Sequence, residues 1–309
     1  MHTGTPVNPG WLSSVVIRKS EVVLTIVPSP FGPVHTRVVG APALPGVILG
    51  PGLGSEWFDW CGVLDLLEPF AHATVYARPG ADGSGRLPRR RPLSREVEIL
   101  ASMLGSANGP AVLVGHSIAA VHVEAAARLH PERVNGVVLI DPDPEVIGAG
   151  RPFDLACLVG DLTLIGCRIP ALRAGFGWSV RHFGVALRRV AVAASTLGRA
   201  DPVPLDVIRE RYTDPGSAEA ALAELAGYAD QVAELDRLRL THPLPAVPWV
   251  VLTAGRSSSA YTRDKHRELA ALAPGGRQVT VPGSRHMMPL DRPDAIARAI
   301  RDVLGYPGV

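Results

Sequence analysis

The sequence predicts an α/β protein in which helices cover both faces of a mostly parallel sheet. Short apolar runs alternate with helical patterns from about residue 46 to residue 142. These runs are continuously apolar, which is typical of strands buried on both faces of a sheet. The alternation stops between residues 143 and 246, where helical spacing prevails, and it resumes after Pro248. We therefore expect one α/β core interrupted by a helical insertion.

Each predicted strand is a short apolar run bounded by turn residues. The predicted strands are Glu21–Val27, Val34–Val39, Gly46–Leu49, Ala73–Ala77, Ala111–Val114, Gly136–Ile140, Trp249–Thr253 and Arg277–Val281. The first two are expected to form a hairpin that turns at residues 29–33. Helices are expected over residues 56–70 and 264–272. A further helix should begin at an N-cap at Ser94, the helix after the elbow should end at about His130, and a last helix should run from an N-cap at Asp291 to about Leu304.

These elements divide the chain into four parts. Residues 1–20 are expected to form an irregular arm, 21–142 the first part of the core, 143–246 the helical insertion, and 247–309 the second part of the core. Within the insertion, Asp214 followed by Pro215 predicts the start of a long helix. Its apolar positions recur at helical spacing as far as Leu238.

The composition excludes several classes of protein. The chain has 309 residues, 47% of them hydrophobic, and a formal net charge of +2, so nothing indicates a nucleic-acid partner. Its three cysteines lack metal-ligand spacing and indicate a reducing, cytoplasmic location without disulfides. No uninterrupted apolar run is long enough to cross a membrane. A homodimer is compatible with the sequence.

The chemistry is expected where the strand Ala111–Val114 runs into Gly115-His116-Ser117-Ile118-Ala119. A strand, a tight turn with a central serine and then a helix form a nucleophile elbow. The turn exposes the serine hydroxyl at a helix N-terminus, where backbone N–H groups favour negative charge. Small residues are needed beside the serine because strand and helix approach closely. The alternative is an ordinary turn in which Ser117 caps a helix.

Further motifs occur in a consistent order along the chain. They are Gly50-Pro-Gly-Leu-Gly-Ser55, Arg78-Pro-Gly80 with Gly83-Ser84, Val112–Ser117, Pro131–Asp141 and Gly283–Pro293. With these motifs, residues 21–307 resemble the α/β-hydrolase fold of serine hydrolases that carry a helical cap. The resemblance implies that Ser117 is the nucleophile and His286 its general base. It also implies an oxyanion hole formed by the backbone N–H groups of Leu53 and Ile118.

The acid of the triad is the open question. Members of this family usually carry an Asp after the strand that matches Trp249–Thr253, and Ser258 stands near that position. Asp141 is our candidate, because some relatives place the acid after the strand that follows the elbow helix. Alternatively, Asp141 only caps the start of the insertion, and Asp143 and Asp264 are less favoured candidates. Other departures from the family pattern are Pro51, Ala77 and Ala119.

The sequence thus favours a serine hydrolase that cleaves a lipophilic ester, thioester or lactone through an acyl-enzyme. The apolar small-molecule substrate is expected to contact Trp57, Phe58 and Trp178. No cofactor or metal is implied. Halide-displacing and epoxide-opening enzymes of this fold require Asp at position 117, which Ser117 excludes. The alternatives are a non-hydrolytic member with an altered triad, such as a cyclase, a lyase or a ligand-binding protein, and a scaffold with a vestigial site.

Overall fold

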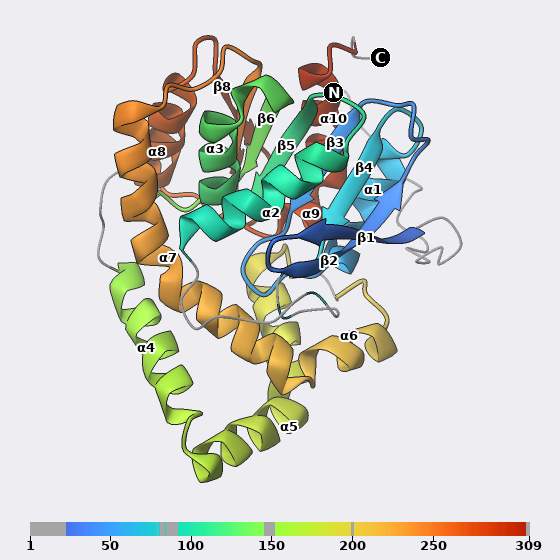
Figure 1. Cartoon of the computed structure of the whole chain (residues 1–309). Helices are drawn as coiled ribbons and strands as arrows, with labels where there is room; N and C mark the ends of the chain where they lie inside the picture. The colour runs from blue at the N-terminus through green and yellow to red at the C-terminus, as the bar shows by residue number, and fades with distance from the viewer. Residues whose placement is uncertain are drawn as a thin grey trace, which may run out of the picture.

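The structure is a computed structural model that describes residues 23–78, 80, 84, 92–144, 152–198 and 201–306. The arm expected over residues 1–20 lies outside the described residues. The described chain forms an eight-stranded sheet in the order β1-β2-β4-β3-β5-β6-β7-β8 (Figure 1). The strands are β1 (Val23–Ser29), β2 (Gly32–Val39), β3 (Gly46–Gly50), β4 (His72–Tyr76), β5 (Ala111–His116), β6 (Val134–Ile140), β7 (Trp249–Ala254) and β8 (Arg277–Val281).

The sheet is mostly parallel, as predicted. β1 pairs with β2, and β2 with β4, in antiparallel fashion, whereas every other pair is parallel. β5 is buried along its whole length because helices cover it on both sides. The parallel strands all end at one edge of the sheet, so the loops that follow β3, β5, β6 and β8 lie together there.

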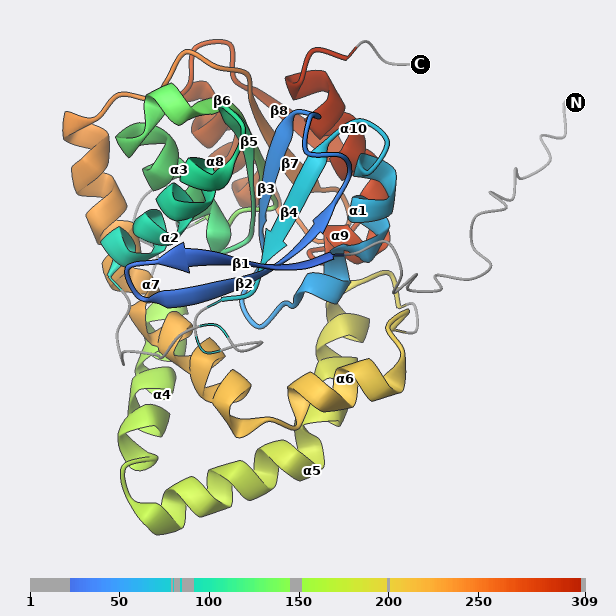
Figure 2. The ribbon, with the colours of Figure 1, turned by 45° about the vertical axis from the view of Figure 1, so that its right-hand side comes forward.

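Two layers of helices enclose the sheet (Figure 2). One layer shares an apolar core with the sheet and consists of α1 (Cys61–Leu67), α9 (Met288–Asp291) and α10 (Pro293–Val303). The other contains α2 (Leu93–Ser106), α3 (Ala119–Leu129) and α8 (Ala260–Ala271). Two short 3-10 helices, η1 (Trp57–Trp60) and η2 (Pro131–Arg133), precede α1 and β6. The α/β fold predicted from the alternating pattern is confirmed.

Two predicted helix starts are wrong in detail. The helix expected from a cap at Ser94 begins at Leu93, with Pro92 at the N-cap. The last helix begins at Pro293 rather than after Asp291. The Asp291 carboxylate instead accepts hydrogen bonds from the N–H groups of Leu197 and Arg285, at 3.2 and 2.9 Å. The Asp291 carboxylate is therefore bonded to residues distant from the helix and does not cap it.

Four helices of the described chain lie between β6 and β7 in sequence: α4 (Pro152–Gly166), α5 (Pro170–Ser195), α6 (Leu205–Tyr212) and α7 (Pro215–Thr241). They lie beyond the edge of the sheet where the parallel strands end (Figures 1 and 2). Asp214 is the N-cap of α7, as predicted, and its carboxylate accepts from the N–H groups of Gly216 and Ser217. Within the described residues, no strand interrupts this segment.

Buried ion pairs join these helices to the α/β core. Arg188 on α5 contacts the Asp59 carboxylate at 2.5 Å and Asp201 at 2.8 Å. Glu224 on α7 pairs with Arg78, which follows β4. Because an unpaired charge at these sites would be costly to bury, each pair fixes the position of a helix over the core.

Candidate active site

The turn after β5 has the geometry of a nucleophile elbow. Ser117 adopts a φ of 54°, in the left-handed region that L-residues rarely occupy. Its N–H donates to the Ile140 carbonyl oxygen at 3.0 Å, which ties the turn to β6. A Cβ at position 115 would lie 2.7 Å from the carbonyl oxygen of Ala119, so Gly115 is required by the close approach of strand and helix.

Three side chains from separate loops form a hydrogen-bonded chain. Nε2 of His286, in the loop after β8, lies 3.1 Å from Oγ of Ser117. Nδ1 of the same ring lies 2.8 Å from Oδ2 of Asp141, which directly follows β6. The sequence analysis singled out these same three residues, which are far apart in the chain. They meet because β5, β6 and β8 end at the same edge of the sheet.

Asp141 is held in place from several sides. Its φ is 41°, and among the described residues only Ser117 and Asp141 are non-glycine residues with positive φ. Its Oδ1 accepts from the Ala254 N–H at 2.9 Å and from the Ser258 hydroxyl at 3.4 Å. Burial raises the pKa of Asp141, but the hydrogen bond and charge of His286 and the Ala254 N–H outweigh it, so the net pKa is lowered. The carboxylate is therefore ionised at neutral pH.

Ser258 stands near the position where the family pattern places its acid. In the structure its side chain lies next to the carboxylate of Asp141. This proximity follows from the pairing of β6 with β7, in which Ile140 is opposite Leu252. The carbonyl oxygen of Ser258 accepts from the Arg263 guanidinium at 2.6 Å. A hydroxyl donor thus occupies the usual acid position and supports the carboxylate on the neighbouring strand.

His116 supports the loop that carries His286. Its Nε2 donates to the His286 carbonyl oxygen at 2.8 Å, so the proton of the neutral ring is on Nε2. Burial, together with the neighbouring His286 ring, lowers the pKa of His116 to about 3. A Cβ at position 52 would lie 2.5 Å from Nδ1 of His116, so Gly52 lets the loop after β3 pass against this ring.

The expected oxyanion donors lie in two different settings. Ile118 is buried at the start of α3, whereas Leu53 is exposed in the loop after β3. Within the described part of the chain, neither N–H donates a hydrogen bond to another residue. The loop is anchored just after Leu53, where the Gly54 carbonyl oxygen accepts from the Tyr212 hydroxyl at 2.7 Å. That hydroxyl in turn accepts from Arg188 at 3.0 Å.

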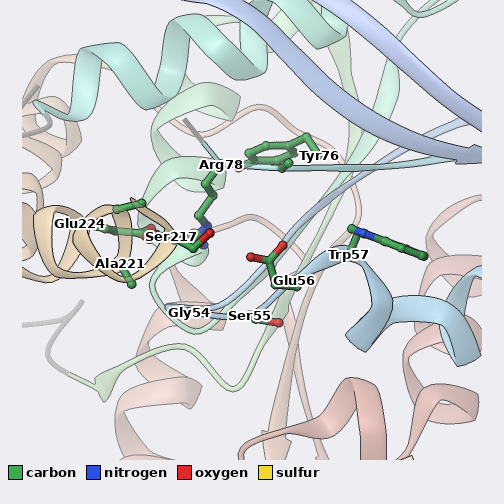
Figure 3. A pocket seen from close by; sticks show the side chains of 11 residues that line it. Gly54, Ser55, Glu56, Trp57, Tyr76, Arg78, Ser217, Ala221 and Glu224 are labelled. Carbon is green, nitrogen blue, oxygen red and sulfur yellow. Dashed lines mark ion pairs between the residues drawn. The ribbon is translucent and has the colours of Figure 1, made fainter. Parts of the chain in front are cut away.

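A small pocket lies beside this loop, between β4, η1 and α7 (Figure 3). Gly54, Glu56 and Trp57 line one side, and Arg78 and Glu224 the other, with the ion pair between these last two at its wall. Burial raises the pKa of Glu56 to about 7, against the opposing charge of Arg211. The pocket's lining includes neither Ser117 nor His286, so it is a different pocket from the apolar one expected between the elbow and the helical insertion.

The residues expected to contact substrate are distributed unevenly. Trp57 lines the pocket of Figure 3. Phe58 is buried in an apolar cluster with Val203 and Ile208, which makes it a packing residue between η1 and α6. Trp178 is 54% exposed on α5, where its ring stacks on His182 at a centroid distance of 4.5 Å.

Two side chains that support the loops around Ser117 and His286 were not predicted from the sequence. Arg188 is one of many arginines in an apolar helix, and no local pattern marks it as the partner of Asp59. The role of His116 was also missed, although its position next to the nucleophile marked it as part of the elbow. Within the described residues, no group of three or more His, Cys, Asp or Glu side chains could hold a metal ion.

The fold and this loop arrangement define an α/β hydrolase. The model of the alpha/beta hydrolase family matches residues 47–299, and the chain belongs to that family. The match covers β3 through most of α10, and so includes the three loops that carry the hydrogen-bonded chain.

Solved structures share the fold at low sequence identity. A putative epoxide hydrolase from Pseudomonas aeruginosa has a TM-score of 0.73 at 19% identity, with 92% of this chain and 95% of that chain covered. The enol-lactonase from Burkholderia xenovorans LB400 has a TM-score of 0.66 at 21% identity, with 91% and 100% covered. A probable transporter, efuK, from Hormonema carpetanum is 31% identical over 119 residues, which cover 35% of this chain and 17% of that protein.

Proposed function

We propose that the chain is a serine hydrolase that cleaves a lipophilic ester, thioester or lactone through an acyl-enzyme on Ser117. The observation that carries the proposal is the hydrogen-bonded chain from Ser117 through His286 to Asp141, with distances of 3.1 and 2.8 Å. A serine hydroxyl needs such a base to become a nucleophile at neutral pH.

In the proposed reaction, Oγ of Ser117 attacks the carbonyl carbon while its proton passes to Nε2 of His286. The ionised Asp141 stabilises the imidazolium that forms and keeps Nδ1 protonated. The imidazolium then returns the proton to the leaving alcohol or thiol. A water molecule, activated by the same nitrogen, releases the acid from Ser117. The His286 side chain is 41% exposed, which gives water access to the base.

The tetrahedral intermediate carries a negative charge on oxygen, for which we propose the N–H groups of Leu53 and Ile118 as donors. Both lack a partner among the described residues, which supports the role. A donor of this kind contributes about 3–4 kcal/mol to transition-state stabilisation in related chemistry. The anchor of Gly54 to Tyr212 limits the movement of the loop that presents the Leu53 N–H.

The identity of the nucleophile argues for an acyl substrate. One structural neighbour is called a putative epoxide hydrolase and another an enol-lactonase. Epoxide opening and halide displacement in this fold use a carboxylate nucleophile, whereas this chain has a serine at position 117. Acyl transfer to a serine hydroxyl is the chemistry that the residues support.

We further propose that α4 to α7 form the cap, so that residues 143–246 cover the site while His286 stays accessible to water. The contacts from Ala194 and Ser195 at the end of α5 to the His286 loop support this arrangement. A cytoplasmic location is also proposed, because Cys61, Cys157 and Cys167 are free thiols.

A non-hydrolytic member of the fold would not need the carboxylate beside the base. The position of Asp141 distinguishes the two proposals, and its 2.8 Å contact with Nδ1 of His286 favours hydrolysis. Without that contact, a cyclase, a lyase or a ligand-binding protein would be equally compatible with Ser117.

A fluorophosphonate probe and a series of p-nitrophenyl esters of increasing chain length test the proposal. Wild-type protein should be labelled and should turn over at least one ester, and Ser117→Ala should lose both activities. Folded wild-type protein that is not labelled would overturn the proposal. Labelling without turnover of any ester, thioester or lactone offered would instead favour a non-hydrolytic role.

A further inference from the structure

The helices α4 and α5 expose an unusual number of large apolar side chains. Leu187 and Val190 are 70% and 66% exposed, although both belong to a helix of the described chain that packs against others. The set that we call the α4–α5 face consists of Leu162 and Ile165 on α4 with Leu172, Phe183, Leu187 and Val190 on α5. α4 and α5 meet at a corner that projects farthest from the sheet in both views (Figures 1 and 2).

Helical spacing places these side chains on the outer side of α5. Phe183, Leu187 and Val190 follow one another at intervals of four and three residues, which share one side of a helix. The buried residues of α5, among them Arg188 and Val192, lie on the other side, toward the core. The apolar stripe therefore faces away from the rest of the described molecule.

The exposed charged side chains on α5 and in the turn before it are all arginines. Residues 162–198 contain five arginines and neither Asp nor Glu. Arg188 is buried against Asp59 and Asp201, and Arg181, seven residues before it, lies on the same side of α5. Arg168, Arg173 and Arg189 are exposed. Asp161, next to Leu162 on α4, is half-buried, and the Glu219 carboxylate on α7 lies 3.6 Å from Arg173.

Exposed apolar side chains together with arginines favour an anionic lipid surface over a second copy of the chain as the partner of this face. A second copy packed on it by a two-fold axis would bring this positively charged face against the same positively charged face. An anionic lipid surface accepts both features, because apolar side chains enter the acyl boundary while guanidinium groups bind lipid phosphates. Trp178, exposed beside His182, is a side chain typical of the membrane interface.

We propose that the α4–α5 face docks the protein on the surface of an anionic phospholipid bilayer. Within the described residues, no helix is long and apolar enough to cross a membrane, so the contact is with the surface of the bilayer. The proposal does not rest on the proposed hydrolysis, since it uses no residue of the Ser117 site. It would place the end of α5, which contacts the His286 loop, close to a lipid phase.

The test is flotation of the full chain with vesicles of phosphatidylcholine, alone or mixed with phosphatidylglycerol. We expect binding to the mixed vesicles that weakens as salt is added. Arg168→Glu combined with Arg189→Glu should reduce it by more than tenfold, since each arginine near an anionic surface contributes roughly fivefold. Leu187→Ser should also reduce binding. Leu240→Ser is the matched control, because Leu240 is 86% exposed but lies on α7, and it should bind like wild type.

Circular dichroism and light scattering complete the experiment. Every substituted side chain is exposed, so the variants should keep the wild-type spectrum and melting temperature. Failure of wild-type protein to bind the mixed vesicles would overturn the proposal. A dimer in solution that Leu187→Ser dissociates, without vesicle binding, would assign the face to a second copy. Fluorophosphonate labelling measures the hydrolase proposal separately, so each proposal can fail without the other.

Discussion

Replacement of Asp141 by Asn should disable the base through the position of a single proton. Oδ1 of Asp141 accepts from the Ala254 N–H, and Oδ2 faces Nδ1 of His286. The N–H of Ala254 would hold the oxygen of the new amide, so the amide NH2 would face Nδ1. Nδ1 must then accept a hydrogen bond, and the ring proton moves to Nε2, which faces Ser117. A ring in this tautomer cannot remove the serine proton.

The expected loss is a factor of about 10⁴ in kcat, the effect of a wrong tautomer in a comparable triad. This factor corresponds to about 5.5 kcal/mol of transition-state stabilisation, at 1.36 kcal/mol for each factor of ten. The substrate's own contacts are unchanged, so KM should change little. The hydrogen bond to Ala254 survives in the variant, and its fold should therefore be retained.

The assay compares kcat for the best p-nitrophenyl ester among wild type, Asp141→Asn and Ser117→Ala at matched far-ultraviolet circular dichroism. Ser117→Ala gives the rate that remains without a nucleophile. A loss of less than about tenfold in Asp141→Asn would refute the reasoning, because the carboxylate would then not be orienting the base.

A substitution at Ser258 tests whether a carboxylate from the neighbouring loop can replace that of Asp141. The Ser258 hydroxyl lies 3.4 Å from Oδ1 of Asp141, and an aspartate at position 258 would carry a carboxylate to this region. Ser258→Asp in the Asp141→Asn background should recover at least about tenfold of the lost kcat. Ser258→Asn is the matched control, since it adds the same bulk without charge and should recover nothing.

Three other substitutions test the supporting groups. Burial lowers the pKa of His116 to about 3, below the unfolded value of about 6.5, so between these values only the unfolded state takes up the proton. As the pH falls below 6, the free energy of unfolding in urea should therefore decrease in wild type by about 1.4 kcal/mol per pH unit more than in His116→Gln. The same pH dependence in both proteins would contradict this. Gly52→Ala puts a Cβ 2.5 Å from Nδ1 of His116 and should lower kcat about 100-fold by displacing the Leu53 N–H, so an unchanged kcat would count against that donor. Arg188→Met leaves Asp59 buried without its partner and should cost about 3–5 kcal/mol in urea unfolding; a loss under about 1 kcal/mol would show that the pair is not important for stability.

The sequence pattern predicted the parallel strands well because most of them are apolar runs bounded by turn residues. β8 occupies the predicted range, Arg277–Val281, and Asp214 caps α7 as expected. Both features depend on residues close together in the chain, where local propensity decides the structure. The expected helix over residues 56–70 is instead the 3-10 helix η1 followed by α1, because Asp59 bonds to the Ser55 hydroxyl and the Glu56 N–H.

Long-range partners explain what the sequence could not predict. Asp291 has the local pattern of a helix cap, but its carboxylate bonds to Leu197 and Arg285. Arg188 is 129 residues from Asp59, and nothing near either residue indicates the contact. The exposed apolar side chains on α5 could not be predicted either, since an apolar helix is expected to be buried unless its packing partners are known.

The acid can stand on either of two neighbouring strands because the sheet order places both near the base. β6 pairs in parallel with β7, and β7 pairs with β8, so the loops that follow all three strands meet at one point. A positive φ at Asp141 turns its side chain toward His286, and the Asp141 N–H remains bonded to the Leu252 carbonyl oxygen on β7 at 2.8 Å. In the proposed triad, the carboxylate at the end of β6 takes the role that the family pattern gives to a residue after β7. Ser258 then donates a hydrogen bond to this carboxylate, which explains how a hydroxyl can occupy the usual acid position without removing the charge from the site.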